Sequence, residues 1–72
     1  MQLDEGMVMA GINLNAASEE ELARVQEIGP ARAHHIVEYR RVNGRFVSAR
    51  ELRYIEGFAP AIVTELARLL RV

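Results

Sequence analysis

Residues Ser18–Pro30 read SEEELARVQEIGP, and a related stretch, SARELRYIEGFAP, follows thirty residues later at Ser48–Pro60. In this register the two copies are identical at Ser, at Glu-Leu (residues 21–22 and 51–52) and at Pro. Most positions that are apolar in one copy are also apolar in the other. A fixed internal period indicates a repeated structural unit. We therefore predict two copies of one unit, at residues 18–43 and 48–72, with residues 42–47 as the joint between them.

Each copy opens with the pattern of a helix N-terminus. In Ser18-x-x-Glu21 and Ser48-x-x-Glu51 the hydroxyl can accept from the amide three residues on, while the Glu reaches back to the Ser amide. Leu and a β-branched residue follow on what would be the inner face of a helix. These two capping boxes predict short helices at residues 19–26 and 49–55.

A proline starts the second helix of each copy. Pro30 and Pro60 suit the first turn, where the missing N–H has no partner to lose. Apolar residues then recur at helical spacing, which predicts helices at 30–43 and 60–71. Gly44 follows the first of these helices and can adopt the left-handed backbone of a helix stop. The predicted inner faces comprise Ala33, Ile36, Val37, Val63, Leu66, Ala67 and Leu70.

The remaining segments connect or flank the helices. Ile12-Asn13-Leu14-Asn15 alternates apolar and polar residues, which predicts an extended lead-in against the bundle. Phe46 is expected to fill the space between the copies, and Tyr39 to be a core residue. We expect residues 1–11 to be a flexible tail, because they show no period. No strand pair is predicted.

Composition describes one small globular domain. The chain has 72 residues, of which 50% are apolar and 26% are charged. It contains no cysteine, which excludes disulfides and thiolate chemistry. Its apolar runs are far shorter than the ~20 residues that a membrane-spanning helix needs, so we expect no membrane contact.

Charge is unevenly distributed although the net charge is only −1. Residues 1–38 hold two Arg against seven acidic residues, whereas residues 39–72 hold seven Arg against three Glu. A neutral protein with this polarity can present a basic face. Every basic residue is Arg, whose planar fork suits bidentate phosphate recognition.

Helix, tight turn and helix, repeated once, resembles the tandem helix-hairpin-helix domain, most closely the ComEA type of bacterial DNA-uptake receptors. The resemblance runs from Ile12 to Val72. It rests on these residues in order: Ile12-Asn13-Leu14-Asn15-Ala16-Ala17-Ser18, Glu20-Glu21-Leu22, Ile28-Gly29-Pro30, Ala33, Ile36, Tyr39-Arg40, Asn43-Gly44-x-Phe46 and Glu51-Leu52. The implied fold is all-α, a SAM-like bundle of four short helices preceded by the extended lead-in.

The resemblance also implies a function, sequence-independent binding of double-stranded DNA with one hairpin to each strand. Unpaired amides at the start of a helix bind phosphate, and a glycine lets the phosphate approach. Such contacts involve the DNA backbone and no base edge. The expected hairpin residues are Ile28, Gly29, Ala31, Arg32, Gly57, Phe58, Ala59 and Ala61, and a second phosphate-contacting surface is expected at Arg40, Arg41 and Arg45.

The two turns depart from the family's Gly-apolar-Gly pattern. The first turn is Glu27-Ile28-Gly29, and its carboxylate is expected to repel phosphate. The second is Gly57-Phe58-Ala59, where the alanine disfavours a positive φ. The position of Arg32 is occupied by Ile62 in the second copy. The alternative is therefore a protein-docking or dimerisation module, with another protein or a second copy as partner.

We expect no enzyme, cofactor or metal. His34 and His35 are adjacent, so on a helix they point about 100° apart and cannot chelate one ion; both are expected to be solvated. Neither Ser18 nor Ser48 has a His at a plausible spacing for a nucleophile, and the chain has no Lys. A fragment of a ComEA-type receptor would lie outside the cytoplasmic membrane, whereas an accessory module of a DNA-processing protein would be cytoplasmic; the sequence leaves both open.

Overall fold

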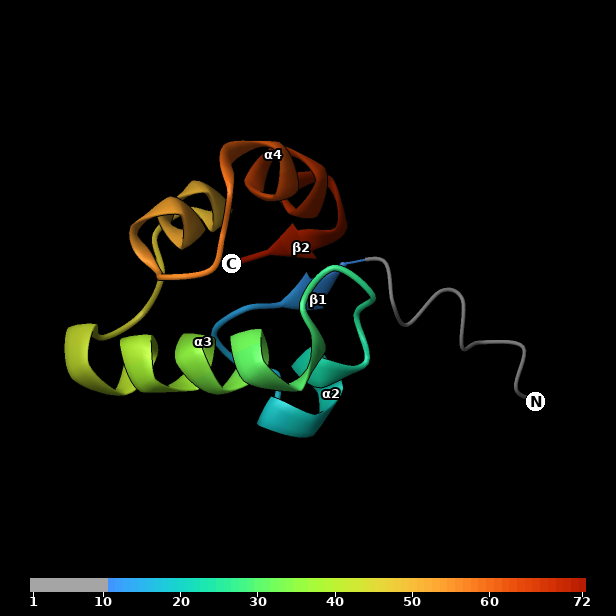
Figure 1. Ribbon diagram of the computed structural model, residues 1–72. Coiled ribbons are helices and arrows are strands. Elements are labelled where there is room, and N and C mark those ends of the chain that lie inside the picture. The colour runs from blue at the N-terminus through green and yellow to red at the C-terminus, as the bar shows by residue number, and fades with distance from the viewer. Residues whose placement is uncertain (1–10) are drawn as a thin grey trace.

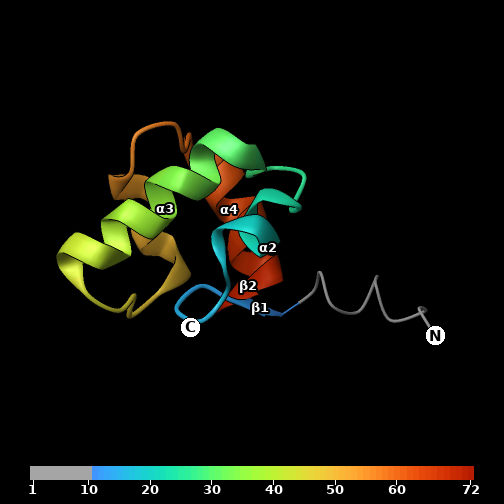
Figure 2. The ribbon, with the colours of Figure 1, turned by 90° about the horizontal axis from the view of Figure 1, so that it is seen from below.

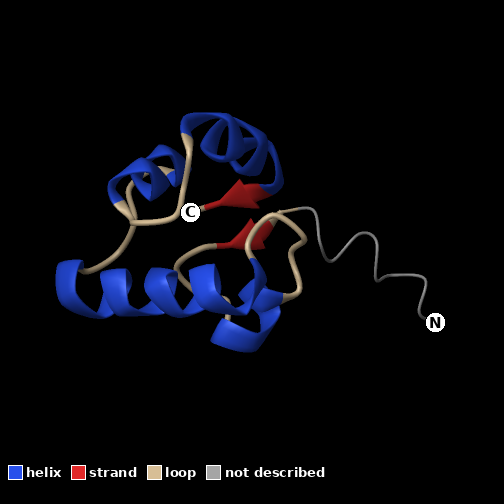
Figure 3. Ribbon diagram, viewed as in Figure 1, coloured by secondary structure: helices blue, strands red, loops and turns tan. Residues whose placement is uncertain are grey.

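The computed structural model describes residues 11–72, and this part of the chain is mostly helical (Figures 1 and 3). The predicted all-α fold is confirmed. In chain order the elements are strand β1 (Ile12–Asn13), helix α2 (Glu19–Ala23), helix α3 (Gly29–Asn43), the 3₁₀ helix η1 (Ala49–Tyr54), helix α4 (Pro60–Leu69) and strand β2 (Leu70–Arg71).

The helices pair within each half of the chain. The main helix contacts join α2 to α3 and η1 to α4. Figure 1 shows α2 and α3 along one side of the molecule and η1 and α4 along the other, with the two short strands between them. Each half is therefore one helix–turn–helix unit. The first unit turns at residues 24–28 and the second at residues 55–59.

The strands β1 and β2 form a parallel pair, in the register Ile12 with Leu70 and Asn13 with Arg71. Our prediction that the chain holds no strand pair is therefore wrong. The extended lead-in is confirmed, because β1 is its first part. Figure 2 shows this pair at the side of the molecule opposite to the turn at residues 55–59. The β1–β2 pair thus joins the two units at one edge of the molecule, and the turn at residues 55–59 lies at the opposite edge.

The C-terminal end of the last helix differs from the prediction for the same reason. Helix α4 ends at Leu69 and not at residue 71, because the next two residues pair with β1. We expected Gly11 to belong to the tail, but its amide donates to the Leu69 carbonyl at 2.6 Å. The Arg71 Nε donates to the Gly11 carbonyl at 2.7 Å. The expectation for residues 1–10 lies outside the described part.

Only the first of the two predicted capping boxes is complete. The Ser18 hydroxyl accepts from the Glu21 amide at 3.1 Å, and the Glu21 carboxylate accepts from the Ser18 amide at 2.9 Å. In the second unit, Glu51 instead accepts from the Val47 amide at 2.9 Å, and Ser48 accepts from the amide two residues on. The tighter 3₁₀ turn of η1 shifts these amides relative to an α-helix. The first short helix ends at Ala23 and η1 at Tyr54, each earlier than expected.

One continuous apolar core joins the two units. Phe46, in the linker, is 1% exposed and stacks on Tyr39 with ring centroids 5.2 Å apart. This confirms the expected position of Phe46 between the copies. Gly44 ends α3 with φ of +87°, as predicted. The fully buried side chains include Leu14, Leu22, Ile28, Ile36, Leu52 and Leu66. Burial of each one contributes about 1.5–3 kcal/mol to the free energy of folding. No helix within residues 11–72 combines the length and the apolar character needed to span a bilayer.

Candidate nucleic-acid interface

The first turn leads from α2 into α3 and uses two of the amides that the sequence assigned to phosphate. The amides of Ile28 and Gly29 both donate to the Val25 carbonyl, at 2.9 and 3.1 Å. The expectation that these two amides are unpaired is therefore wrong. The Ile28 side chain is 2% exposed and belongs to the core. Because the turn is closed by the Val25 carbonyl, a ligand must bind to the amides that follow it.

The amides that follow Pro30 lie at an exposed helix N-terminus. Pro30 and Ala31 are exposed and Arg32 is half-buried. Within residues 11–72, the amides of Ala31 and Arg32 donate to no residue outside α3. The first amides of a helix lack an internal partner and carry a partial positive charge. This end of α3, which is fifteen residues long, can accept an anion.

The second turn leads from η1 into α4, and here too a buried apolar residue has a hydrogen-bonded amide while its neighbours are exposed. The Phe58 side chain is 6% exposed, and its amide donates to the Ile55 carbonyl at 3.3 Å. Gly57, Ala59 and Ala61 are exposed. In the part of the chain that the structure describes, none of their amides donates to a residue outside α4. The second turn therefore presents exposed amides on either side of a buried apolar residue.

The glycines of the two turns occupy different positions for a conformational reason. Gly29 has φ of +70° in the first turn, and Gly57 has φ of +98° in the second. Ala59 corresponds to Gly29 in the repeat, yet its φ is −71°. The structure shows no positive φ at any non-glycine residue it describes, so Glu27 is unstrained. Each turn thus keeps its glycine where the backbone needs it, and the alanine that we expected to disfavour the bend is in an ordinary conformation.

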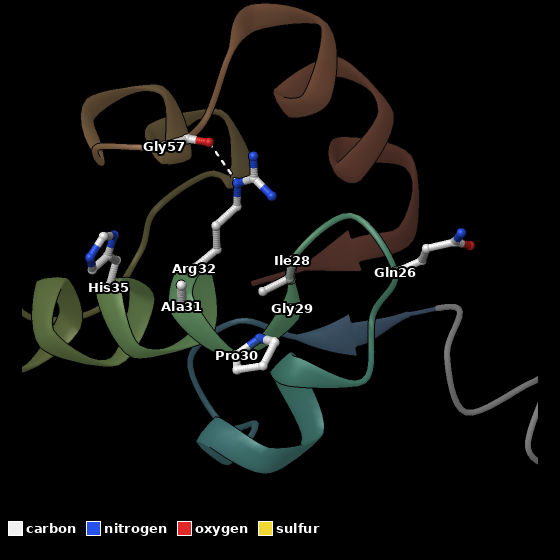
Figure 4. A pocket seen from close by; sticks show the side chains of 8 residues that line it. All are labelled: Gln26, Ile28, Gly29, Pro30, Ala31, Arg32, His35 and Gly57. Atoms are coloured by element: carbon white, nitrogen blue, oxygen red, sulfur yellow. Dashed lines mark hydrogen bonds between the residues drawn. The ribbon is translucent and has the colours of Figure 1, made fainter.

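Arg32 and His35 project from α3 onto the second turn. The Arg32 Nε donates to the Gly57 carbonyl at 2.6 Å, and Nη1 donates to the Glu27 carbonyl at 3.4 Å (Figure 4). The His35 Nδ1 lies 3.2 Å from the carbonyl oxygen of Glu56. His35 was expected to be solvated, whereas the structure places it, half-buried, against the second unit. His35 follows Arg32 by about one helical turn, so both side chains project from the same face of α3. The sequence contained this spacing, and our prediction did not use it.

A cleft lies along these contacts, with a volume of about 490 Å³. Figure 4 shows the side chains that line it, from the first turn, the start of α3 and the second turn. The lining residues are Gln26, Ile28, Gly29, Pro30, Ala31, Arg32, His35 and Gly57. Glu27 is absent from the lining, so its carboxylate does not fill the first turn. The cleft therefore brings the start of α3, Gly57 of the second turn and one guanidinium to the same surface.

The three arginines expected to form a second surface are used differently. The Arg40 Nη1 donates to the Leu14 carbonyl at 2.7 Å, which ties the lead-in to α3. The Arg41 Nη2 lies 2.7 Å from a Glu38 carboxylate oxygen, and this pair raises the pKa of Arg41 and lowers the pKa of Glu38. Arg45 is exposed. Arg41 lies about 14 Å along the helix from Arg32, at 1.5 Å per residue, so these arginines are separate from the cleft.

The other histidine and the arginine near Tyr54 also have local partners. The His34 Nδ1 lies 3.4 Å from a Glu19 carboxylate oxygen, and both side chains are exposed. The Arg53 Nη2 donates to the Tyr54 hydroxyl at 3.1 Å, an interaction that raises the pKa of Arg53. Its guanidinium also lies 5.1 Å from the centre of the Tyr54 ring. These contacts connect neighbouring surface residues and add nothing to the cleft.

The structure thus contains two helix pairs, α2 with α3 and η1 with α4, each joined by a tight turn. A family model described as "Helix-hairpin-helix motif" matches residues 9–71, and the chain belongs to this family. It is 37% identical over 46 residues to ComE operon protein 1 of Bacillus subtilis, covering 64% of this chain and 22% of that protein.

Two further relatives come from primates. The S1 RNA-binding domain-containing protein 1 of Homo sapiens and that of Pongo abelii are each 27% identical to the chain over 70 residues. The match covers 97% of this chain but only 7% of either relative. The chain therefore spans a small fraction of the length of the curated proteins that it matches.

Proposed function

We propose that this chain binds double-stranded DNA without sequence preference, through the main-chain amides of two helix-hairpin-helix motifs. The observation that carries the proposal is the cleft that places the exposed start of α3, with Arg32, beside Gly57 of the second turn. In this proposal each unit contacts one strand. The contacting amides are those of Ala31, Arg32, Gly57, Ala59 and Ala61.

The chemistry of the surface supports a backbone contact. Amide donors at a helix N-terminus favour anionic oxygens, and they carry no information on base identity. The Nη2 of Arg32 has no acceptor within residues 11–72, so it is free for a charge-assisted hydrogen bond to a phosphate. Arg41 and Arg45 are exposed and can add long-range attraction along α3. Arg40 is omitted from this set because its guanidinium is bound to the Leu14 carbonyl.

The proposed role is tethering DNA, either in uptake or as an accessory module of a larger DNA-processing protein. The uptake role is supported by the ComEA-type motifs and by the match to ComE operon protein 1. We propose a binding module and not an enzyme, because the chain has neither Lys nor Cys and its Ser18 and Ser48 hydroxyls accept hydrogen bonds at helix starts.

Titration of a fluorescent 20-base-pair duplex with the full chain at low salt tests the proposal. With about three to five neutralised phosphates, the dissociation constant should lie between about 1 and 100 μM and rise steeply with salt. Two duplexes of unrelated sequence should bind equally. Absence of binding at ~1 mM protein would overturn the proposal in favour of the docking module, which sedimentation or pull-down with a partner would then have to show.

The charge of Glu27 supplies a matched comparison. Glu27→Gln removes the carboxylate while keeping the backbone and the side-chain size. Glu27 lies in the first turn, so removal of its negative charge should tighten DNA binding by about two- to fivefold at low salt. Glu65→Gln is the control, because Glu65 is exposed and lies on α4, away from the first turn. It should change the dissociation constant by less than about twofold. Equal effects of the two variants would place DNA away from the first turn.

A further inference from the structure

Arg32 contacts two main-chain carbonyls that correspond to each other in the repeat. Its Nη1 donates to the Glu27 carbonyl at 3.4 Å, and its Nε donates to the Gly57 carbonyl at 2.6 Å. Glu27 and Gly57 are thirty residues apart, which is the period of the two copies. One guanidinium therefore lies between equivalent points of the two turns, as Figure 4 shows for the Gly57 side.

Only one of the two copies can supply such a group. The residue that corresponds to Arg32 is Ile62, which is half-buried and packs against the core. A second guanidinium aimed at the same pair of carbonyls would meet the first, and two like charges about 4 Å apart repel. The Ile at this position is therefore what a shared contact point requires. The second copy has not simply lost a basic residue, as the sequence suggested.

At the hairpin end the two units share the apolar core, which includes Ile28 and Phe58 of the turns. The helices pack mainly within each unit, α2 on α3 and η1 on α4. The β1–β2 pair joins the units at another edge. At the turns, the contacts are Arg32 with Gly57, the Arg32 guanidinium 5.8 Å from the Phe58 ring centre, and His35 with the Glu56 carbonyl. Beside the shared core, Arg32 is the side chain that donates hydrogen bonds to main-chain carbonyls of both turns.

We infer that Arg32 is a positioning residue that holds the second turn at a fixed distance and angle from the first. The consequence of this inference for DNA binding rests on the proposed function. If the two turns are held in a fixed arrangement, their amides can contact two DNA strands without an ordering step on binding. Binding sites that are already ordered avoid an entropic cost on association. The planar fork of Arg is needed, because a single ammonium cannot donate along both directions with the same geometry.

The arrangement of the units can be measured without DNA. Residual dipolar couplings would be collected for backbone amides of α3 and α4 in the full chain, in Arg32→Ala, in Arg32→Lys and in a control, Arg68→Ala. Arg68 is exposed on α4, so this control removes one positive charge away from the turns. We expect one alignment tensor to fit both units in the wild type and in the control, and two different tensors to be required in both Arg32 variants. A single unchanged tensor in Arg32→Ala would overturn the inference.

DNA titration of the same proteins tests the consequence. Both Arg32 variants should bind about five- to tenfold more weakly than the wild type, and the control less than about twofold more weakly. If Arg32→Lys binds as tightly as the wild type, only the charge matters and the positioning role is wrong. If the wild type itself does not bind DNA, the proposed function fails, while the dipolar couplings still decide whether Arg32 sets the arrangement of the turns.

Discussion

Asn15 and Phe46 exchange two hydrogen bonds across thirty-one residues of sequence. The Phe46 amide donates to the Asn15 Oδ1 at 2.6 Å, and the Asn15 Nδ2 donates to the Phe46 carbonyl at 3.1 Å. The Asn side chain thus pairs with the backbone of the linker as a neighbouring strand would. Because Phe46 is buried between the units, this pair joins the lead-in to the point where the two copies meet.

We expect Asn15→Ala to lower the free energy of unfolding by about 1–3 kcal/mol, because it leaves the partly buried Phe46 amide without an acceptor. Urea denaturation measures the change. Asn43→Ala is the control. Asn43 is exposed, and among residues 11–72 its side chain bonds only to the Tyr39 carbonyl one turn earlier, so the cost should stay within about 0.5 kcal/mol. Similar costs for the two variants would contradict the bridging role.

Gly57 and Ala59 of the second turn should respond differently to substitution. Gly57→Ala should lower the free energy of unfolding by about 1–2 kcal/mol, because its φ of +98° is left-handed. A Cβ there would lie 3.7 Å from the Arg32 Cγ, an ordinary contact, so the cost comes from the backbone. Ala59→Gly restores the family pattern but should change stability by less than about 0.5 kcal/mol, since Ala59 has φ of −71°. Thermal unfolding of the two variants would show the reverse order if the turns were misassigned.

The amide of Ala59 can be removed without straining the turn. Proline requires φ near −65°, and Ala59 has φ of −71° with no acceptor for its amide in the described part of the chain. Ala59→Pro should therefore keep the fold and weaken duplex binding about tenfold, the loss of one charge-assisted hydrogen bond. Ala59→Gly keeps the amide, adds no side chain that could accept from the amides of α4 and should bind like the wild type. Unchanged binding by a folded Ala59→Pro would exclude this amide from the interface.

Arg40 and Arg45 should separate stability from DNA binding. Arg40→Ala removes the hydrogen bond to the Leu14 carbonyl and should cost about 1–2 kcal/mol of unfolding free energy. Arg45 is exposed, so Arg45→Ala should leave the melting temperature nearly unchanged and weaken DNA binding about twofold at low salt. Calorimetry and titration of both variants test the pair. If Arg40→Ala is as stable as the wild type but binds DNA weakly, Arg40 contacts DNA and its omission from the proposed interface is wrong.

The Glu38 carboxylate should titrate below its ordinary pKa, because it accepts a hydrogen bond from Arg41 and lies beside its positive charge. A group whose pKa is lower in the folded state adds stability above its unfolded pKa, and that stability is lost as the pH falls through the folded pKa. We expect carboxyl NMR titration to show the Glu38 pKa rising toward its ordinary value in Arg41→Ala. An unchanged Glu38 pKa in that variant would mean that the pair does not persist in solution.

Local sequence was sufficient to predict much of the fold. The thirty-residue repeat indicates two copies of one unit. The first capping box, the prolines at the helix starts and the glycine after Asn43 each act within a few residues, so they predict helices directly. Ile28 and Phe58, which we expected among the DNA-contacting hairpin residues, instead have buried side chains. The predictions failed where pairing depends on distant segments, as in β1 with β2 and in the early end of α4.

For the candidate site, the sequence by itself determined which residues form the two turns, because a repeat, its glycines and its prolines are written in local order. Only the tertiary structure decided which amides remain exposed, that Arg40 bonds the lead-in instead of facing solvent, and that Arg32 joins both turns. The physical reason is that a hydrogen bond between segments depends on how the two units pack against a shared core, and no local pattern encodes the direction in which a long arginine side chain then finds its acceptor.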